Sequence, residues 1–311
     1  MNEFRSSFVD ADDVHLHYLE WDSASTNAAL DADAEASDTT DSIPLVLLHG
    51  LGATADTWLL VAKELQKQHQ VIAFDLRGHG QSDQPENGYD LVTIAEDVIC
   101  AMAKLGFGQV AVVAHGWGAR VALVLAARHP ALVSHLILVD CPHVEPRHWP
   151  GMTRERFIRE KSPEASYASL ASYLDGWRAE MSTFWSSDIE AIVLTYIWKL
   201  PDGGVEDRLL PEHQVKIRAS LWEDRALSYY GKLACPVLLV PAAAKPRPDE
   251  ELPERLEDAD EFAAAKGQMA AQVSRAIQRC SVLWMPATVH DIQLQHPQVL
   301  AQSIINFLRS G

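Results

Sequence analysis

The chain has 311 residues, of which 48% are hydrophobic and 22% are charged, and its formal net charge at pH 7 is −17. This length allows one large domain with an insertion, or two small domains, around a sizeable core. The negative charge argues against nucleic acid and anionic membrane surfaces as partners, because both select basic faces. No apolar run approaches the roughly 20 residues that cross a bilayer, so no membrane association is expected.

The cysteine pattern favours a reducing compartment. The four cysteines show neither a metal-ligand spacing nor a CxxC pair, so reduced thiols are expected. No long apolar run follows the first residues, and a signal peptide is therefore not expected. Together these features predict a cytoplasmic protein.

The predicted elements begin with a hairpin at the edge of a sheet. Residues 4–9 and 14–21 alternate apolar and polar side chains around a short Asp-rich turn. Residues 23–42 contain no aromatic and no basic residue. Such a segment buries too little apolar surface to offset its ordering entropy, so it is predicted to form an acidic flexible loop.

Strands and helices then alternate along the chain. Apolar runs predict buried strands at 44–48, 71–74, 110–113 and 135–139. Helical patterns lie between and after these strands, at 57–68, 91–105 and 119–129. This alternation predicts the α/β class, with a mostly parallel central sheet and helices on both faces.

The pattern changes from residue 141 to residue 233. Strand patterns are absent there, and aromatic residues lie in helical patterns. We expect a helical cap at 141–233, inserted after the sixth strand into a core made of residues 1–140 and 234–311. The later predicted elements are a strand at 237–240, a Pro/Glu/Asp-rich stretch at 245–260, a helix at 261–279, a strand at 281–285 and a closing helix at 297–308.

The turn after the fifth predicted strand has the form of a nucleophile elbow. Small residues at Ala114 and Gly118 flank its tip, and a helix follows at once. The tip of such an elbow normally carries Ser, Asp or Cys, whereas here it is Gly116. Glycine adopts the strained backbone of the tip at no steric cost, but it has no side chain that attacks a substrate.

These features together resemble the α/β-hydrolase fold superfamily, in particular its cap-bearing esterases, epoxide hydrolases and haloalkane dehalogenases. The resemblance extends over nearly the whole chain. It rests on His49-Gly50-Leu51-Gly52, on residues 75–83 (DLRGHGQSD), on the elbow, and on His290 between the last strand and the last helix. It implies an α/β-hydrolase fold with a helical cap and chemistry on a small-molecule substrate.

The resemblance also implies roles for individual residues. His290 matches the general base that takes a proton from the nucleophile or from water. Asp140 matches the acid that orients the base, and Asp249 is the alternative. The backbone N–H groups of Leu51 and Trp117 match the two donors of an oxyanion hole.

Three residues are expected to line the substrate pocket: His115, Trp117 and Leu51. In the family, the position of His115, like that of His49, is usually structural. Cys141 is a poor replacement nucleophile, because its spacing places no base beside it. No metal or other cofactor is expected, since no ligand spacing, dinucleotide fingerprint or P-loop is present.

Gly116 leaves several functions open. The first is a hydrolase of a small, mostly apolar ester-like substrate that is impaired or inactive because its Ser or Asp nucleophile is missing. Loss of a triad nucleophile typically removes about 10⁶-fold in turnover. The alternatives are non-covalent catalysis by His290, as in a lyase or a cofactor-free oxygenase, and a non-catalytic ligand-binding protein. The substrate and the oligomeric state are not predicted.

Overall fold

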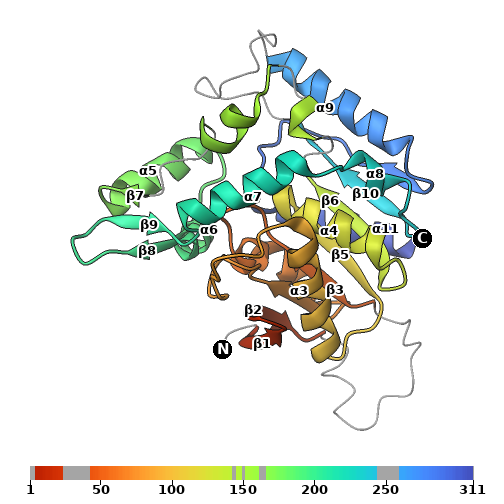
Figure 1. The fold of residues 1–311 in the computed structure, drawn as a ribbon, viewed down its shortest axis with the longest axis horizontal. Helices are drawn as coiled ribbons and strands as arrows, with labels where there is room; N and C mark the ends of the chain where they lie inside the picture. The colour runs from red at the N-terminus through yellow and green to blue at the C-terminus, as the bar shows by residue number, and fades with distance from the viewer. Residues whose placement is uncertain are drawn as a thin grey trace.

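The computed structural model describes residues 4–23, 43–141, 145–148, 151–160, 166–243 and 259–310. Within these residues, an eight-stranded sheet has the order β1-β2-β4-β3-β5-β6-β10-β12 (Figure 1). Its strands are β1 (Arg5–Ala11), β2 (Val14–Trp21), β3 (Leu45–Leu48), β4 (Val71–Phe74), β5 (Val110–His115), β6 (Val133–Val139), β10 (Val237–Val240) and β12 (Cys280–Val282). β1 and β2 pair antiparallel, β2 joins β4 antiparallel, and the remaining pairs are parallel. The predicted mostly parallel sheet is confirmed.

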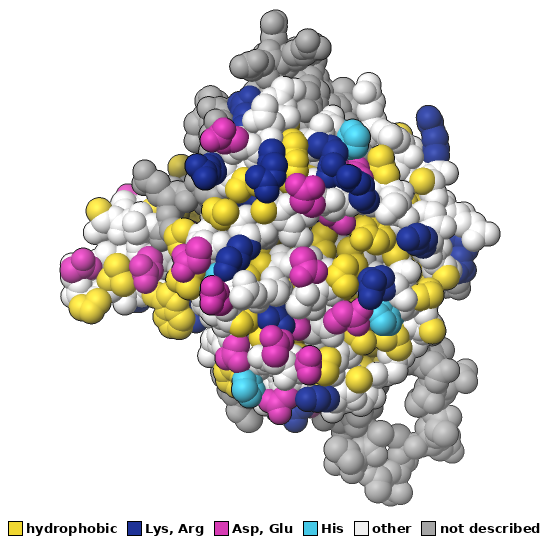
Figure 2. All heavy atoms as spheres, in the orientation of Figure 1, with side chains coloured by type: hydrophobic (Ala, Val, Ile, Leu, Met, Phe, Trp, Pro, Cys, Tyr) yellow, Lys and Arg dark blue, Asp and Glu magenta, His cyan; other side chains and the backbone are white. Residues whose placement is uncertain are grey.

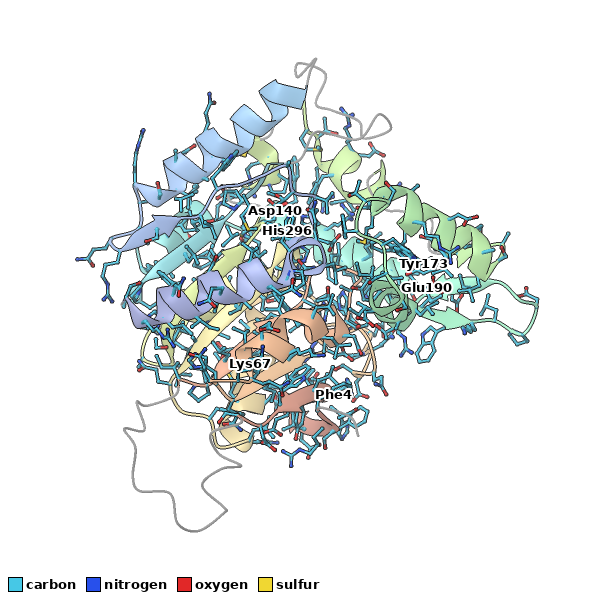
Figure 3. All side chains as sticks on the ribbon, turned by 180° about the vertical axis from the view of Figure 1, so that it is seen from behind. Phe4, Lys67, Asp140, Tyr173, Glu190 and His296 are labelled. Atoms are coloured by element: carbon cyan, nitrogen blue, oxygen red, sulfur yellow. The ribbon has the colours of Figure 1, made fainter. Side chains whose placement is uncertain are left out.

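Helices cover both faces of this sheet, as Figures 1 and 3 show from opposite sides. Val112 and Ala114 of β5 pack in one apolar core with α3 (Leu91–Lys104) and α4 (Gly116–Arg128). The alternate residues of β5 pack in a second core, which contains α2 (Leu59–Leu65) and α11 (Pro297–Arg309). A strand buried on both faces has no polar side, which explains its uninterrupted apolar run.

Several predicted boundaries differ from the observed ones. A 3₁₀ turn, η1 (Ala55–Trp58), precedes α2 where one continuous helix was predicted. The predicted strand at 281–285 is divided between β12 and β13 (Met285–Pro286), and β13 pairs with β11 (Ala242–Ala243). The other late helices are α9 (Ala259–Ser274) and α10 (Ile292–Gln295). Residues 24–42 of the predicted acidic loop and residue Asp249 lie outside the described residues.

The segment between β6 and β10 is mostly helical. Its elements are η2 (Pro146–His148), η3 (Arg156–Glu160), α5 (Leu170–Glu180), α6 (Ser187–Val193), η4 (Leu194–Tyr196), α7 (Pro211–Glu223) and α8 (Leu227–Tyr230). The prediction that this segment lacks strands was wrong, because it also holds an antiparallel sheet of β7 (Ser166–Tyr167), β9 (Val205–Asp207) and β8 (Ile197–Lys199). Strands of two or three residues are too short to show a period-two pattern.

Some aromatic residues of this segment build a third apolar cluster, whereas Phe157 and Tyr230 pack in the core that contains α3 and α4. Tyr173, Trp177 and Tyr196 form a chain of edge-on ring contacts. Leu294 of α10 belongs to the same core, so the segment also packs on the main body of the fold. On the face seen in Figure 2, acidic and basic side chains are interspersed. No helix in the described ranges combines the length and the apolar character that crossing a bilayer demands.

Gly118 sets how closely α4 approaches β3. A Cβ at this position would lie 2.2 Å from the carbonyl oxygen of His49. Gly118→Ala is therefore expected to lower the free energy of unfolding by about 1–3 kcal/mol, measured by urea titration. Gly176 in α5 is the matched control, because nothing lies within 4 Å of its added Cβ. Gly176→Ala should raise stability by up to about 1 kcal/mol, and similar losses in both variants would contradict the packing argument.

Candidate active site

The elbow lies where β5 ends and α4 begins. Gly116 is the first residue of α4, and its φ of +52° is in the left-handed region. A Cβ added to Gly116 would lie 3.2 Å from Nε2 of His290 and 3.8 Å from Cα of Gly50. The structure therefore brings His290 against the position that a side chain at residue 116 would occupy.

Asp140 binds Nδ1 of His290, the ring nitrogen that faces away from Gly116. Nδ1 of His290 lies 2.7 Å from Oδ2 of Asp140, and Oδ1 of Asp140 accepts a hydrogen bond from the Ala242 N–H at 2.9 Å. An ionised carboxylate only accepts hydrogen bonds, so Nδ1 carries the proton and the lone pair of Nε2 faces Gly116. The side chain of Asp140 is 7% exposed, whereas that of His290 is 52% exposed. Figure 3 shows Asp140 near the centre of the fold.

The geometry of the Asp140 backbone helps to aim its carboxylate. Asp140 follows β6 directly, its φ is +38°, and its N–H donates to the carbonyl of Val240 at 2.8 Å. A non-glycine residue with positive φ is strained, and the surrounding bonds hold it there. Sequence analysis missed the contribution of Ala242, because a backbone donor leaves no signal in a side-chain pattern.

The proposed oxyanion donors lie on two segments beside Gly116. Trp117 is the second residue of α4, so its N–H has no acceptor within the helix. Leu51 follows Gly50, whose Cα faces the same vacant position. A Cβ at Gly50 would lie 2.8 Å from Nδ1 of His115, so only glycine permits this close approach.

His49 fixes the loop that carries Leu51. Its Nδ1 donates to the carbonyl of Gly50 at 2.7 Å, and its Nε2 accepts from the N–H of Leu76 at 2.9 Å. Burial lowers the pKa of His49, which keeps the ring neutral. These contacts favour the structural role that the family position implies.

The three residues expected to line the pocket are not equally accessible. His115 is buried behind His290, with the ring centroids 4.4 Å apart and its Nε2 3.1 Å from the His290 carbonyl oxygen. Trp117 is also buried, and its ring stacks on His79 at 5.1 Å. Leu51 is only partly buried. The geometry thus favours support of the His290 backbone as the role of His115.

Protonation of His115 is expected to destabilise the fold. Burial, together with the nearby charge of His290, lowers the pKa of His115 to about 4, against about 6.5 for an unperturbed histidine. Between these values the unfolded chain binds a proton that the folded chain does not, so the contribution of His115 to stability falls as pH falls. The slope should reach about 1.4 kcal/mol per pH unit and vanish above about pH 6.5.

Urea unfolding between pH 4.5 and 7.5 checks this expectation. The variant His115→Gln should show a shallower loss of stability on acidification than the unmodified chain, whatever its absolute stability. Equal slopes would mean that His115 takes up its proton in the folded state.

The surroundings of Cys141 disfavour it as a replacement nucleophile. It is buried, and burial raises the pKa of its thiol to about 12, so almost no thiolate forms at neutral pH. No group of three or more potential metal ligands occurs in the part of the chain that the structure describes.

Comparison with known proteins assigns the family. A family model described as the alpha/beta hydrolase fold matches residues 43–240. The chain therefore belongs to the α/β-hydrolase fold family.

Sequence similarity to individual proteins is confined to about a third of this chain, whereas structural similarity extends over nearly all of it. The chain is 42% identical over 97 residues to the soluble epoxide hydrolase of Corynebacterium sp. (strain C12). The matched residues make up 31% of this chain and 34% of that protein. It is also 31% identical over 101 residues to epoxide hydrolase 4 of Mus musculus. This match makes up 32% of this chain and 28% of that protein. The chain thus matches about a third of the length of these relatives.

Solved structures extend the similarity to the whole chain. The crystal structure of E-2-(acetamidomethylene)succinate hydrolase superposes with a TM-score of 0.75 at 20% identity, over 98% of this chain and 99% of that one. A thioesterase domain from the curacin biosynthetic pathway superposes with a TM-score of 0.72 at 15% identity. The superposition covers 98% of this chain and 100% of that domain. At these identities the likeness shows the fold alone.

Proposed function

We propose that this protein is a hydrolase-type enzyme for a small, mostly apolar ester-like substrate, and that its turnover is slow because Gly116 stands at the nucleophile position. One observation carries the proposal. Nε2 of His290 faces the vacant side-chain position of Gly116 at 3.2 Å, while Nδ1 is bonded to the buried carboxylate of Asp140. The hydrolases among its sequence relatives and structural neighbours support the same class.

In this proposal, water replaces the missing side chain. His290 Nε2 accepts a proton from a water molecule as its oxygen attacks the substrate carbonyl carbon. Asp140 stabilises the imidazolium that forms, and the N–H groups of Leu51 and Trp117 stabilise the developing oxyanion. His290 then returns the proton to the leaving alcohol, so the base ends the cycle unchanged.

We also propose that residues 141–233 act as a cap on a core of residues 1–140 and 234–311. Two features support this division: the segment lies between β6 and β10 in the chain, and part of it forms an apolar cluster separate from the two cores of the sheet.

A test of the primary proposal removes the base. His290→Ala is expected to reduce the residual hydrolysis of short nitrophenyl esters by about 10²–10⁴-fold, because general-base catalysis contributes that much. The matched control is His129→Ala, a partly exposed histidine that also contacts a carboxylate, Glu96, at 3.0 Å. Turnover that persists in His290→Ala, or falls equally in both variants, would contradict the proposal.

The His290–Asp140 pair would equally serve a second candidate, in which His290 removes a proton from carbon. Such an enzyme would take the proton from a carbon next to a carbonyl group and would hold the resulting enolate with the two N–H donors. His290-dependent deuterium exchange at that carbon, without ester cleavage, would distinguish this lyase-type or oxygenase-type chemistry from hydrolysis.

A further inference from the structure

A second histidine–aspartate pair joins the edge hairpin to the neighbouring strand, because His17 lies on β2 and Asp75 directly follows β4. Nδ1 of His17 is 2.8 Å from Oδ2 of Asp75, and Nε2 of His17 is 2.8 Å from Oγ of Ser6. Ser6 is exposed, whereas His17 and Asp75 are buried. The hydroxyl of Ser6 is thus the accessible end of a chain of three hydrogen-bonded groups.

The register of the hairpin explains how these residues meet. β1 pairs Ser6 with Leu19 and Phe8 with His17. Residues two apart on a strand share a face, and diagonal cross-strand neighbours are within reach of long side chains. Ser6 and Phe8 therefore lie on the face of β1 that meets the His17 ring.

Both carboxylate oxygens of Asp75 accept hydrogen bonds, as do those of an acid that orients a catalytic base. Its Oδ1 accepts from the N–H of Ala55 at 2.7 Å, and its Oδ2 accepts from the N–H of Gln81 at 2.9 Å as well as from His17. Burial alone would raise the pKa of Asp75, but the hydrogen bond from His17 and the proximity of His49 outweigh it and lower the pKa. The carboxylate is ionised at neutral pH and accepts the Nδ1 proton of His17.

Gln81 is a second neighbour of Nε2 of His17. Its side-chain amide nitrogen, which is only a donor, lies 3.2 Å from Nε2 of His17. Because Nδ1 carries the proton that Asp75 accepts, Nε2 has a single lone pair, toward which both the Ser6 hydroxyl and the Gln81 amide point. This is the arrangement in which a neighbouring base activates a serine hydroxyl.

We propose that Ser6, His17 and Asp75 form a second nucleophilic site that is acylated by activated esters of small aryl or alkyl acids. Oγ of Ser6 attacks the acyl carbon as its proton passes to Nε2 of His17. The bond to the leaving alcohol then breaks, and His17 gives the alcohol its proton. Water releases the acid from acyl-Ser6 by the same two proton transfers in turn.

Two further observations support this substrate class. The side chain of Phe8 is 55% exposed, and its ring centroid lies 5.2 Å from that of His17, so an apolar surface borders the hydroxyl. Figure 3 shows Phe4, just before β1, well apart from Asp140 in the view. Ser6 and His290 therefore belong to different sites, although Leu76, the residue after Asp75, donates its N–H to His49, which fixes the loop of Leu51.

The test is covalent labelling of the full chain with a fluorophosphonate, followed by peptide mass spectrometry. Ser7 is the internal reference, because it is adjacent to Ser6 but points to the opposite face of β1. Activation by a base predicts that Ser6 is labelled at least about 100-fold faster than Ser7 in the folded chain. In the urea-unfolded chain the two rates should become similar.

Matched variants complete the experiment. Ser6→Ala should abolish the fast label, whereas Ser7→Ala and His290→Ala should leave it unchanged. Labelling of Ser6 no faster than Ser7 in the folded chain, or a fast label that survives in Ser6→Ala, overturns the proposal. Because Ser6 is exposed, its substitution by alanine leaves the buried packing intact.

Discussion

Gly116→Ser is expected to raise kcat/KM for short nitrophenyl esters by at least about 1000-fold over the unmodified chain. A triad nucleophile typically accounts for about 10⁶-fold in turnover, or about 8 kcal/mol of transition-state stabilisation. The added Cβ would lie 3.2 Å from Nε2 of His290, so the hydroxyl comes within reach of the base. The strain of a side chain at a φ of +52° costs about 1–3 kcal/mol, which is smaller than the expected gain.

The fit at residue 116 is tight but adjustable. The added Cβ would also lie 3.4 Å from Cε1 of His290, so the ring must shift by a few tenths of an ångström. Because the side chain of His290 is 52% exposed, the ring has room to move outward while Nδ1 remains bonded to Asp140.

Three further variants isolate the effect of the hydroxyl. Gly116→Ala adds the same Cβ without a nucleophile and should not increase ester hydrolysis. Gly116→Asp places a carboxylate instead, and it should be assayed with epoxides and haloalkanes as well as esters. Combining Gly116→Ser with His290→Ala should remove the gain. If neither Ser nor Asp exceeds Ala, the interpretation of Gly116 as a vacated nucleophile position is wrong.

Asp224→Ala is expected to lower the free energy of unfolding by about 3–5 kcal/mol. Asp224, just after α7, pairs with Arg120 on α4, and both side chains are buried. Removing one partner of a buried ion pair leaves the other charge without its main compensation, which costs far more than the pair contributes. Urea unfolding of the full chain measures the change.

The neighbouring residue provides the control. Glu223 lies 3.5 Å from Arg154, and both side chains are exposed, so Glu223→Ala should cost less than about 1 kcal/mol. Replacing both buried partners, with Arg120→Met and Asp224→Leu together, should recover most of the stability. Equal effects of Asp224→Ala and Glu223→Ala would show that the buried pair does not anchor α7 to the elbow helix.

The sequence by itself determined the class of the fold and most of the central sheet. The apolar runs at β3, β4 and β5 predict strands buried on both faces, because a parallel strand covered by two helical layers has no polar side. The order of the strand-end motifs likewise places Gly116 and His290 at the same edge of the sheet, since the carboxyl ends of parallel strands share one edge. The hydrophobic periods of helices and strands are local properties, so the sequence alone predicts them.

The family resemblance offered Asp140 or Asp249 as the partner of His290, and the tertiary structure shows which side chains make contact. Asp140 and His290 are 150 positions apart, and their 2.7 Å contact depends on how β6, β10 and the last loops pack. The Arg120–Asp224 pair and the Ser6–His17–Asp75 chain also join residues that no local pattern connects. The short strands β7, β8 and β9 escaped prediction for a related reason. Their pairing is set by contacts between distant segments, which overrule the weak preference of two or three residues.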